Sequence, residues 1–188
     1  MIFGHLLTSS NYDKDEKKIV GGKNGYGAKL TNIFSTSFTI ETVDHVRLKK
    51  YSQLFESNMT VKHKPRITRY KGKPYTKVTW IADLSRFGIT AYSPDMIRLM
   101  QRRVYDIAGI TDKKVSVHLN GDKLNIKSFH DYNRLYLSEN DIYIPDDTCD
   151  RWSIGVSLSK TDKFEQISFV NGIATPKGGK HVDAMSKL

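Results

Sequence analysis

Hydrophobic residues recur along the chain with two different spacings, and each spacing predicts a different kind of element. Leu30, Ile33 and Phe34 are separated by three and four residues, which indicates a short amphipathic helix. We expect this apolar stripe to pack against a core. The polar neighbours Lys29 and Asn32 are expected to face away from it.

Near-alternation of apolar and polar residues then predicts strands. Phe38, Ile40 and Val43 indicate a half-buried strand directly after the helix. Three further strands are expected at residues 46–52, 59–63 and 75–82. The sequence Tyr-Lys-Gly-Lys-Pro at 70–74 is typical of a hairpin turn, so we predict a mainly antiparallel sheet.

A longer helix is predicted to begin at Pro94, with Ser93 as its N-cap and Gly109 as its end. The apolar residues at helical spacing, which are expected to form core, are Met96, Ile97, Met100, Val104 and Ile107. Asn120-Gly121 then predicts a tight hairpin, because both residues tolerate the positive φ that such a turn needs.

The last third of the chain predicts a smaller lobe. Residues 152–158 and 167–170 are expected to be two strands of a second sheet, and a helix is expected after Gly178-Gly179. A lobe with so few strands is expected to be only marginally stable by itself.

Four glycines within seven positions, Gly21, Gly22, Gly25 and Gly27, run directly into the first predicted helix. Glycine lets the backbone approach a ligand closely, and a helix start offers unpaired N–H groups and a partial positive charge to phosphate. The spacing fits neither the Walker A loop nor the dinucleotide fingerprint. Alone, this loop is either a nucleotide site or a plain helix entry.

The distribution of charge indicates a second candidate binding site. The chain has 30 Lys and Arg against 20 Asp and Glu, a net charge of +10, which favours an anionic partner. The excess gathers at Arg47, Lys49, Lys50, Lys62, Lys64, Arg66, Arg69, Lys71, Lys73 and Lys77. The interleaved Tyr51, Tyr70 and Tyr75 suit nucleic acid, but also a solvated face with aromatics packed across strands, which we prefer.

One cysteine, Cys149, excludes an internal disulfide and suits a reducing compartment. No apolar run has the length of a membrane span, and the first residues lack a signal-peptide pattern. We therefore expect an intracellular protein that is neither membrane-bound nor secreted.

Three blocks of sequence stand out in the first part of the chain: IFGHLLTSSNYD at 2–13, GGKNGYGAKL at 21–30 and NIFS at 32–35. They closely resemble the ATP-lid region of eukaryotic-type DNA topoisomerase II, a type IIA enzyme of the GHKL ATPase superfamily. Later blocks at 102–109, 119–124, 166–175 and 177–183 follow in the same order. These later blocks separate the chain from Hsp90-type chaperones, mismatch-repair proteins and histidine kinases.

The resemblance implies an α+β fold. Residues 1–126 would be the C-terminal part of a GHKL (Bergerat) ATPase α/β sandwich with a mainly antiparallel sheet. Residues 127–188 would be the start of a transducer domain.

The resemblance also implies an ATP site. The matching residues are Ser9, Ser10, Asn11, Gly22, Lys23, Asn24, Gly25, Tyr26, Gly27, Ala28 and Lys29. The lid amides would bind phosphate oxygens, and Lys29 would add a positive charge. Without the resemblance, Ser9 or Ser10 would be a helix N-cap and Asn24 a turn residue. Lys23 stands where the family often has arginine, and Gly172 where it has a small hydroxyl residue.

As a member of this family, the intact enzyme would pass one DNA duplex through a transient break in another, driven by ATP and Mg²⁺. It would act as a homodimer and be nuclear in a eukaryotic cell. The family's general base and Mg²⁺-binding asparagine precede the lid, and a phosphate-contacting lysine follows the last block. We therefore expect no catalytic residue and no metal ligand here, and no activity from this chain alone. The alternative is a non-catalytic, basic nucleic-acid-binding module from a degenerate or split ATPase.

Overall fold

The computed structural model describes residues 2–9, 11, 21–22, 24–149 and 151–187. Its contacts divide the chain into two compact units. The first unit comprises Met1–Lys18 and Gly22–Ala91, and the second comprises Ile19–Gly21 and Tyr92–Leu188. The functional boundary expected between residues 126 and 127 stays a prediction.

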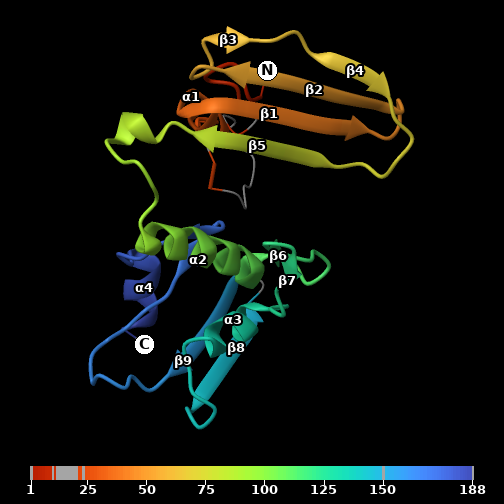
Figure 1. The fold of residues 1–188 in the computed structure, drawn as a ribbon. Coiled ribbons are helices and arrows are strands. Elements are labelled where there is room, and N and C mark those ends of the chain that lie inside the picture. The colour runs from red at the N-terminus through yellow and green to blue at the C-terminus, as the bar shows by residue number, and fades with distance from the viewer. Residues whose placement is uncertain (1, 10, 12–20, 23, 150, 188) are drawn as a thin grey trace. The chain divides into compact units, whose positions relative to one another are not determined.

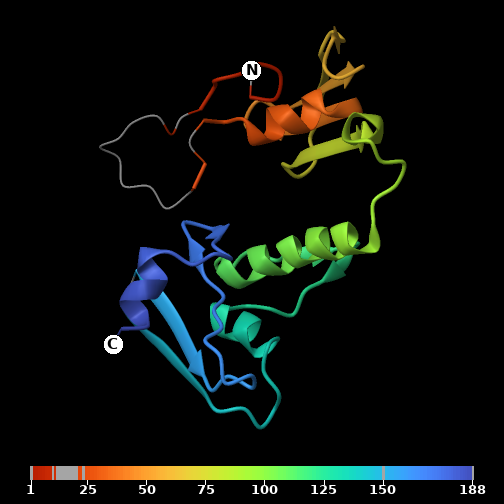
Figure 2. The ribbon, with the colours of Figure 1, turned by 90° about the vertical axis from the view of Figure 1, so that its left-hand side faces the viewer.

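The first unit is one antiparallel sheet with a short helix (Figure 1). Its elements are α1 (Gly27–Ile33), β1 (Ser35–Asp44), β2 (Lys49–Glu56), β3 (Val61–Lys62), β4 (Arg66–Arg69), β5 (Thr76–Ala82) and the 3₁₀ helix η1 (Leu84–Phe87). The order across the sheet is β3-β2-β1-β5, and β4 also pairs with β2. Helix α1 contacts β1 and β5 (Figure 2).

The core of this unit lies on one face of the sheet. Phe38, Ile40 and Phe55 are buried, and the rings of Phe38 and Phe55 meet edge to face with centroids 6.2 Å apart. The partly buried side chains packed around them are Phe3, Tyr51, Met59 and Val78. The alternation that predicted a half-buried strand is thus confirmed for Phe38 and Ile40. Val43 is also buried, but it pairs with Lys50 and so lies on the opposite face of the sheet.

Two predicted strands are shorter or shifted because local turns intervene. Residues 46–48 form a turn in which the Asp44 carboxylate accepts the N–H groups of Val46 and Arg47, so β2 begins only at Lys49. Residues 57–59 all have positive φ, between 51° and 65°, which leaves only Val61–Lys62 as strand.

The predicted hairpin turn at 70–74 is wrong. Strand β4 pairs with β2, whereas β5 pairs with β1 at the other edge of the sheet. The β1–β2 hairpin already occupies the centre of the sheet, so the segment between β4 and β5 connects opposite edges instead of neighbouring strands.

The second unit consists of short elements. They are α2 (Pro94–Ile110), β6 (His118–Leu119), β7 (Asp122–Lys123), α3 (Phe129–Arg134), β8 (Tyr143–Cys149), β9 (Trp152–Ser157), β10 (Phe169–Val170), β11 (Ile173–Ala174) and α4 (Lys180–Met185). The Asn120-Gly121 hairpin and the helix after Gly178-Gly179 are confirmed. The single second sheet is wrong, because β9 pairs with β8 and β10 pairs with β11.

Helix α2 begins as predicted, since the Ser93 hydroxyl accepts the N–H of Met96 at 3.2 Å. Its apolar stripe, however, is not core. Four side chains of the stripe have exposed fractions between 43% and 51%, namely Met96, Ile97, Met100 and Ile107. The buried face instead carries Asp106, Ala108 and Gly109.

The packing of α2 against α3 explains this reversal. A Cβ on Gly109 would lie 2.6 Å from Cγ of Tyr132, so glycine is required here for close contact and does not end the helix. The Tyr132 hydroxyl donates to Oδ1 of the buried Asp106 at 2.6 Å, and Arg103 donates to Oδ2 at 2.8 Å. The interface between α2 and α3 is therefore made by small residues and a buried carboxylate. The periodicity of apolar residues had predicted larger side chains there.

Changing Tyr132 to phenylalanine is expected to lower the free energy of unfolding of the second unit by about 1.5–3 kcal/mol, because a hydrogen bond to a buried carboxylate is lost. Urea unfolding of the whole chain tests this in a Trp80→Phe background, where Trp152 is the only remaining tryptophan and reports on this unit. Tyr136→Phe is the control, since the Tyr136 side chain is exposed and its hydroxyl lies 2.8 Å from the Tyr132 hydroxyl, whereas the Tyr132 hydroxyl is the one that donates to Asp106. Equal losses in both variants would contradict the assigned role of Asp106.

Candidate functional site

The glycine loop leads into α1 in a way that leaves amide groups available. The first backbone hydrogen bond of α1 joins the N–H of Leu30 to the carbonyl of Tyr26 at 2.8 Å. The N–H groups of Gly27, Ala28 and Lys29 therefore have no acceptor within the helix. A Cβ placed on Gly27 would meet no atom within 4 Å, so the space beside these amides is open among the described residues.

Gly25 has a structural reason to be glycine. Its φ is +65°, and a Cβ there would lie 2.6 Å from the carbonyl oxygen of Thr8. The loop therefore needs both the conformation and the close approach that glycine permits. Gly25 and Gly27 thus have different roles, one in shaping the loop and the other in leaving open space.

Lys29 lies in a different environment from the one expected. The side chain is only 1% exposed, and its Nζ donates to the carbonyls of Thr8 at 2.9 Å and Gly25 at 2.7 Å. Two of the three ammonium donors therefore hold the loop to the preceding segment. The ammonium group fixes the loop beside α1, and its contact with a phosphate stays a prediction.

The expected orientation of α1 is wrong. Asn32 is 1% exposed and its Nδ2 donates to the carbonyl of Phe3 at 3.1 Å, whereas Leu30 is 45% exposed. The backbone carbonyls of residues 3 and 8 lie against this side of the helix, so side chains with N–H donors are buried there. Helical spacing of apolar residues did not reveal that the neighbour of α1 would be a polar backbone.

The two sequence segments predicted to form the site lie together. Nδ2 of Asn11 donates to the carbonyl of Gly22 at 2.7 Å, and the Ser9 hydroxyl accepts the Asn11 N–H at 3.1 Å. Ser9 thus closes a local turn and caps no helix. Asn24 and Tyr26 are exposed on the loop. Ser10 and Lys23 lie outside the described residues.

The aromatic residues of the basic segment are packed as we preferred. Tyr51 lies against the core, and the rings of Tyr70 and Tyr75 meet edge to face with centroids 6.2 Å apart. The Tyr75 hydroxyl donates to Glu41 at 2.9 Å. This hydrogen bond is the largest cause of the lowered pKa of Glu41, and the hydrogen bond from Lys50 is the second.

Sequence reasoning missed a hollow of about 260 Å³ on the sheet. It is lined by Glu41, Lys50, Ser52, Arg66 and Thr68. These residues come from three strands, and only the pairing of the strands brings them together. No motif in the linear sequence could therefore predict the hollow. The alternation of polar residues along β2 and β4 is the one signal that the sequence offered.

A second missed cluster joins α3 to β8. Nδ1 of His130 lies 2.5 Å from the Tyr143 hydroxyl, and Nε2 lies 2.6 Å from Oδ2 of Asp147. Among the described residues, no group of three or more His, Cys, Asp or Glu is arranged to hold a metal ion. Within the same residues, no helix combines the length and apolarity needed to cross a bilayer.

Comparison with known proteins gives relatives along almost the whole chain, although no family model matches it. It is 55% identical over 192 residues to DNA topoisomerase 2 of Arabidopsis thaliana, and 48% identical over 202 residues to that of Saccharomyces cerevisiae. Each match covers 97% of this chain but only 13% and 14% of the relative. The chain thus spans about a seventh of the length of these relatives.

The fold is also similar to solved structures. The ATPase region of Saccharomyces cerevisiae topoisomerase II matches 99% of this chain with a TM-score of 0.91 and 50% identity, and 50% of that structure is covered. The ATPase and transducer domains of DNA topoisomerase II from Balamuthia mandrillaris match with a TM-score of 0.90 and 45% identity.

Fold and loop together define an α+β segment of the GHKL ATPase kind, with a mainly antiparallel sheet and a glycine-rich loop before its first helix. The sequence matches make the assignment more specific. The chain belongs to the eukaryotic-type DNA topoisomerase II family, as a segment related to the ATPase region.

Proposed function

We propose that this chain supplies the ATP lid and the first part of the transducer of an ATP-dependent type IIA DNA topoisomerase. That enzyme passes one DNA duplex through a transient double-strand break in another. The observation that carries the proposal is the identity of about half the residues along 97% of the chain. Within the matching part, hydrogen bonds of Lys29 hold Thr8 beside Gly25. This continuity supports the topoisomerase over a degenerate nucleic-acid-binding module.

In this proposal the nucleotide is held mainly by main-chain groups. The amides of Gly27, Ala28 and Lys29 would donate to phosphate oxygens, and the partial positive charge of the α1 N-terminus would add to the attraction. Lys29 would support the loop from behind through Thr8 and Gly25. Asn11 would hold the start of the lid through Gly22.

The remaining parts of the reaction would come from elsewhere in the enzyme. A general base and the ligands of Mg²⁺ are proposed to lie in other segments. The working enzyme is proposed to be a nuclear homodimer that binds DNA and ATP. Closure of the lid over the nucleotide would shift the transducer and relay the nucleotide state to the DNA-cleaving part.

Hydrogen exchange tests the lid assignment. We expect a non-hydrolysable ATP analogue to slow exchange at the amides of residues 27–29 when this chain replaces the equivalent part of the yeast ATPase region. The amides of Leu30 and Phe34, already bonded in α1, are internal references that should change less. Binding of the analogue without protection at residues 27–29 would place the phosphates elsewhere.

A further inference from the structure

The positive charge of this chain is concentrated in one stretch of sequence. Residues 45–77 contain ten Lys and Arg but a single acidic residue, Glu56. This stretch therefore carries a formal charge of +9, against +10 for the whole chain. Protein surfaces ordinarily intersperse both signs, so a one-sided field of this size needs a reason.

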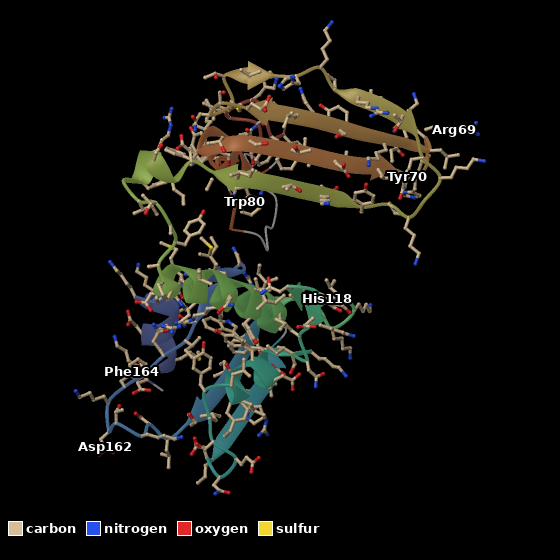
Figure 3. The ribbon with its side chains drawn as sticks, in the orientation of Figure 1. Arg69, Tyr70, Trp80, His118, Asp162 and Phe164 are labelled. Carbon is tan, nitrogen blue, oxygen red and sulfur yellow. The ribbon has the colours of Figure 1, made fainter. Side chains whose placement is uncertain are left out.

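Most of these charges are not neutralised by carboxylates. Arg47 pairs with Asp44 and Lys50 pairs with Glu41. In the part of the chain that the structure describes, the other eight basic residues of the stretch have no ion-pair partner. All eight are exposed, on the strands and connections around β2, β4 and β5. Figure 3 shows one of them, Arg69, where β4 ends beside Tyr70.

Strand register places several of these groups on one face of the sheet. Arg66 pairs with Ser52, Ser52 pairs with Glu41, and Glu41 pairs with Lys77, which forms a row across β4, β2, β1 and β5. Directly paired residues share a face, and the next residues along each strand point to the opposite one. Phe38 and Ile40 belong to that opposite face, so the row lies on the outer face, away from the core.

The hollow lies within this outer face and has the chemistry of an anion site. Arg66 and Lys50 provide cationic donors, and Ser52 and Thr68 provide hydroxyl groups. Phosphate oxygens are bound by these side chains, with arginine able to donate two parallel hydrogen bonds. Glu41 is the one carboxylate that lines the hollow. It forms an ion pair with Lys50 and accepts a hydrogen bond from the Tyr75 hydroxyl.

We propose that the outer face of this sheet, centred on Lys50, Arg66 and Lys77, binds the phosphate backbone of duplex DNA. Cations distributed over several strands suit a ligand with closely and regularly spaced charges, and contacts to phosphates do not depend on base sequence. The choice of DNA over another polyanion rests on the proposed function. The contact itself requires neither nucleotide nor the lid.

Salt-dependent binding of the 188-residue chain to a fluorescent 30-base-pair duplex, without nucleotide, tests the proposal. We expect Arg66→Gln with Lys77→Gln to weaken binding by about tenfold and to reduce the slope of log K against log salt by about 1.8, which is about 0.9 for each lost phosphate contact. The control, Lys113→Gln with Lys114→Gln, removes the same charge from exposed residues of the second unit and should leave the slope unchanged. Equal effects of the two variants, or no binding of the duplex at 50 mM salt, would overturn the proposal.

Glu41→Gln gives a change of opposite sign. Removing the negative charge that lines the hollow should tighten DNA binding several-fold, a result that damage to the fold would not produce. Weaker binding by a folded Glu41→Gln chain would count against the site. Binding to phosphatidylserine vesicles or heparin that depends on Arg66 and Lys77, without such dependence for the duplex, would also overturn it. If the ATP analogue did not protect the amides of residues 27–29 while DNA binding still depended on Arg66 and Lys77, the proposed lid function would be wrong. The DNA-binding proposal would stand.

Discussion

Replacing Phe38 by alanine is expected to lower the free energy of unfolding of the first unit by about 3–5 kcal/mol. Phe38 is 1% exposed and lies between Phe3 and Phe55, with ring centroids 6.0 and 6.2 Å away. The substitution removes the central ring of a small core and leaves a cavity that the paired strands cannot close. A loss of this size approaches the whole stability of a typical domain.

Denaturant unfolding of the full chain in a Trp152→Phe background measures this effect. Trp80 is then the only tryptophan, and it pairs directly with Phe38 across β1 and β5. Ile67→Ala is the control, because Ile67 is an apolar strand residue that is 60% exposed, and its loss should cost about 0.5 kcal/mol or less. A Phe38→Ala variant as stable as this control would show that the assigned core is wrong.

Gly27→Val is expected to reduce ATP hydrolysis by about 100-fold while leaving the fold intact. Valine is at least as compatible with a helix as glycine, and a Cβ at this position meets no atom within 4 Å. The branched side chain would instead cover the amides of Ala28 and Lys29. Loss of two charge-assisted hydrogen bonds of about 1.5 kcal/mol each gives about two orders of magnitude.

Steady-state ATPase assays of a chimera, in which this chain replaces the matching part of the yeast enzyme, measure kcat/KM for this variant. Leu30→Val is the matched control, since it places the same side chain on an exposed position one turn further along α1. Equal activities of the two variants would show that open space at Gly27 has no function.

The sequence predicted most of the elements because their signals are local. Ser93 caps α2 through its own side chain, Asn120-Gly121 adopts the positive φ of a tight turn, and alternation marks Phe38 and Ile40 as buried. Each of these signals lies within a few positions along the chain.

The predictions that failed concern residues whose partners are distant in the sequence. Lys29 is buried because the carbonyl of Thr8, 21 residues earlier, accepts a hydrogen bond from its ammonium group. Gly109 is buried because Tyr132 lies over it. The order of strands, with β4 and β5 at opposite edges, is likewise not encoded in the segment between them. Periodicity shows that a face is apolar but does not identify what will cover it.

The same limit applies to the candidate site. The glycine spacing announced a loop of special conformation, and the structure explains it at Gly25. The convergence of Asn11 on Gly22 followed from family resemblance, since no rule of spacing links residues on either side of such a loop. The excess of Lys and Arg in this stretch could be read from the sequence. Only the strand register shows that Arg66 and Lys77 lie on the same face of the sheet.

The most direct measurement is relaxation of a negatively supercoiled plasmid by yeast DNA topoisomerase 2 carrying this chain in place of its own segment. We expect ATP-dependent relaxation by the unmodified chimera, its loss on Gly27→Val and its retention on Leu30→Val. A folded chimera that relaxes the plasmid equally well with and without Gly27→Val would contradict the claim that these amides bind the nucleotide.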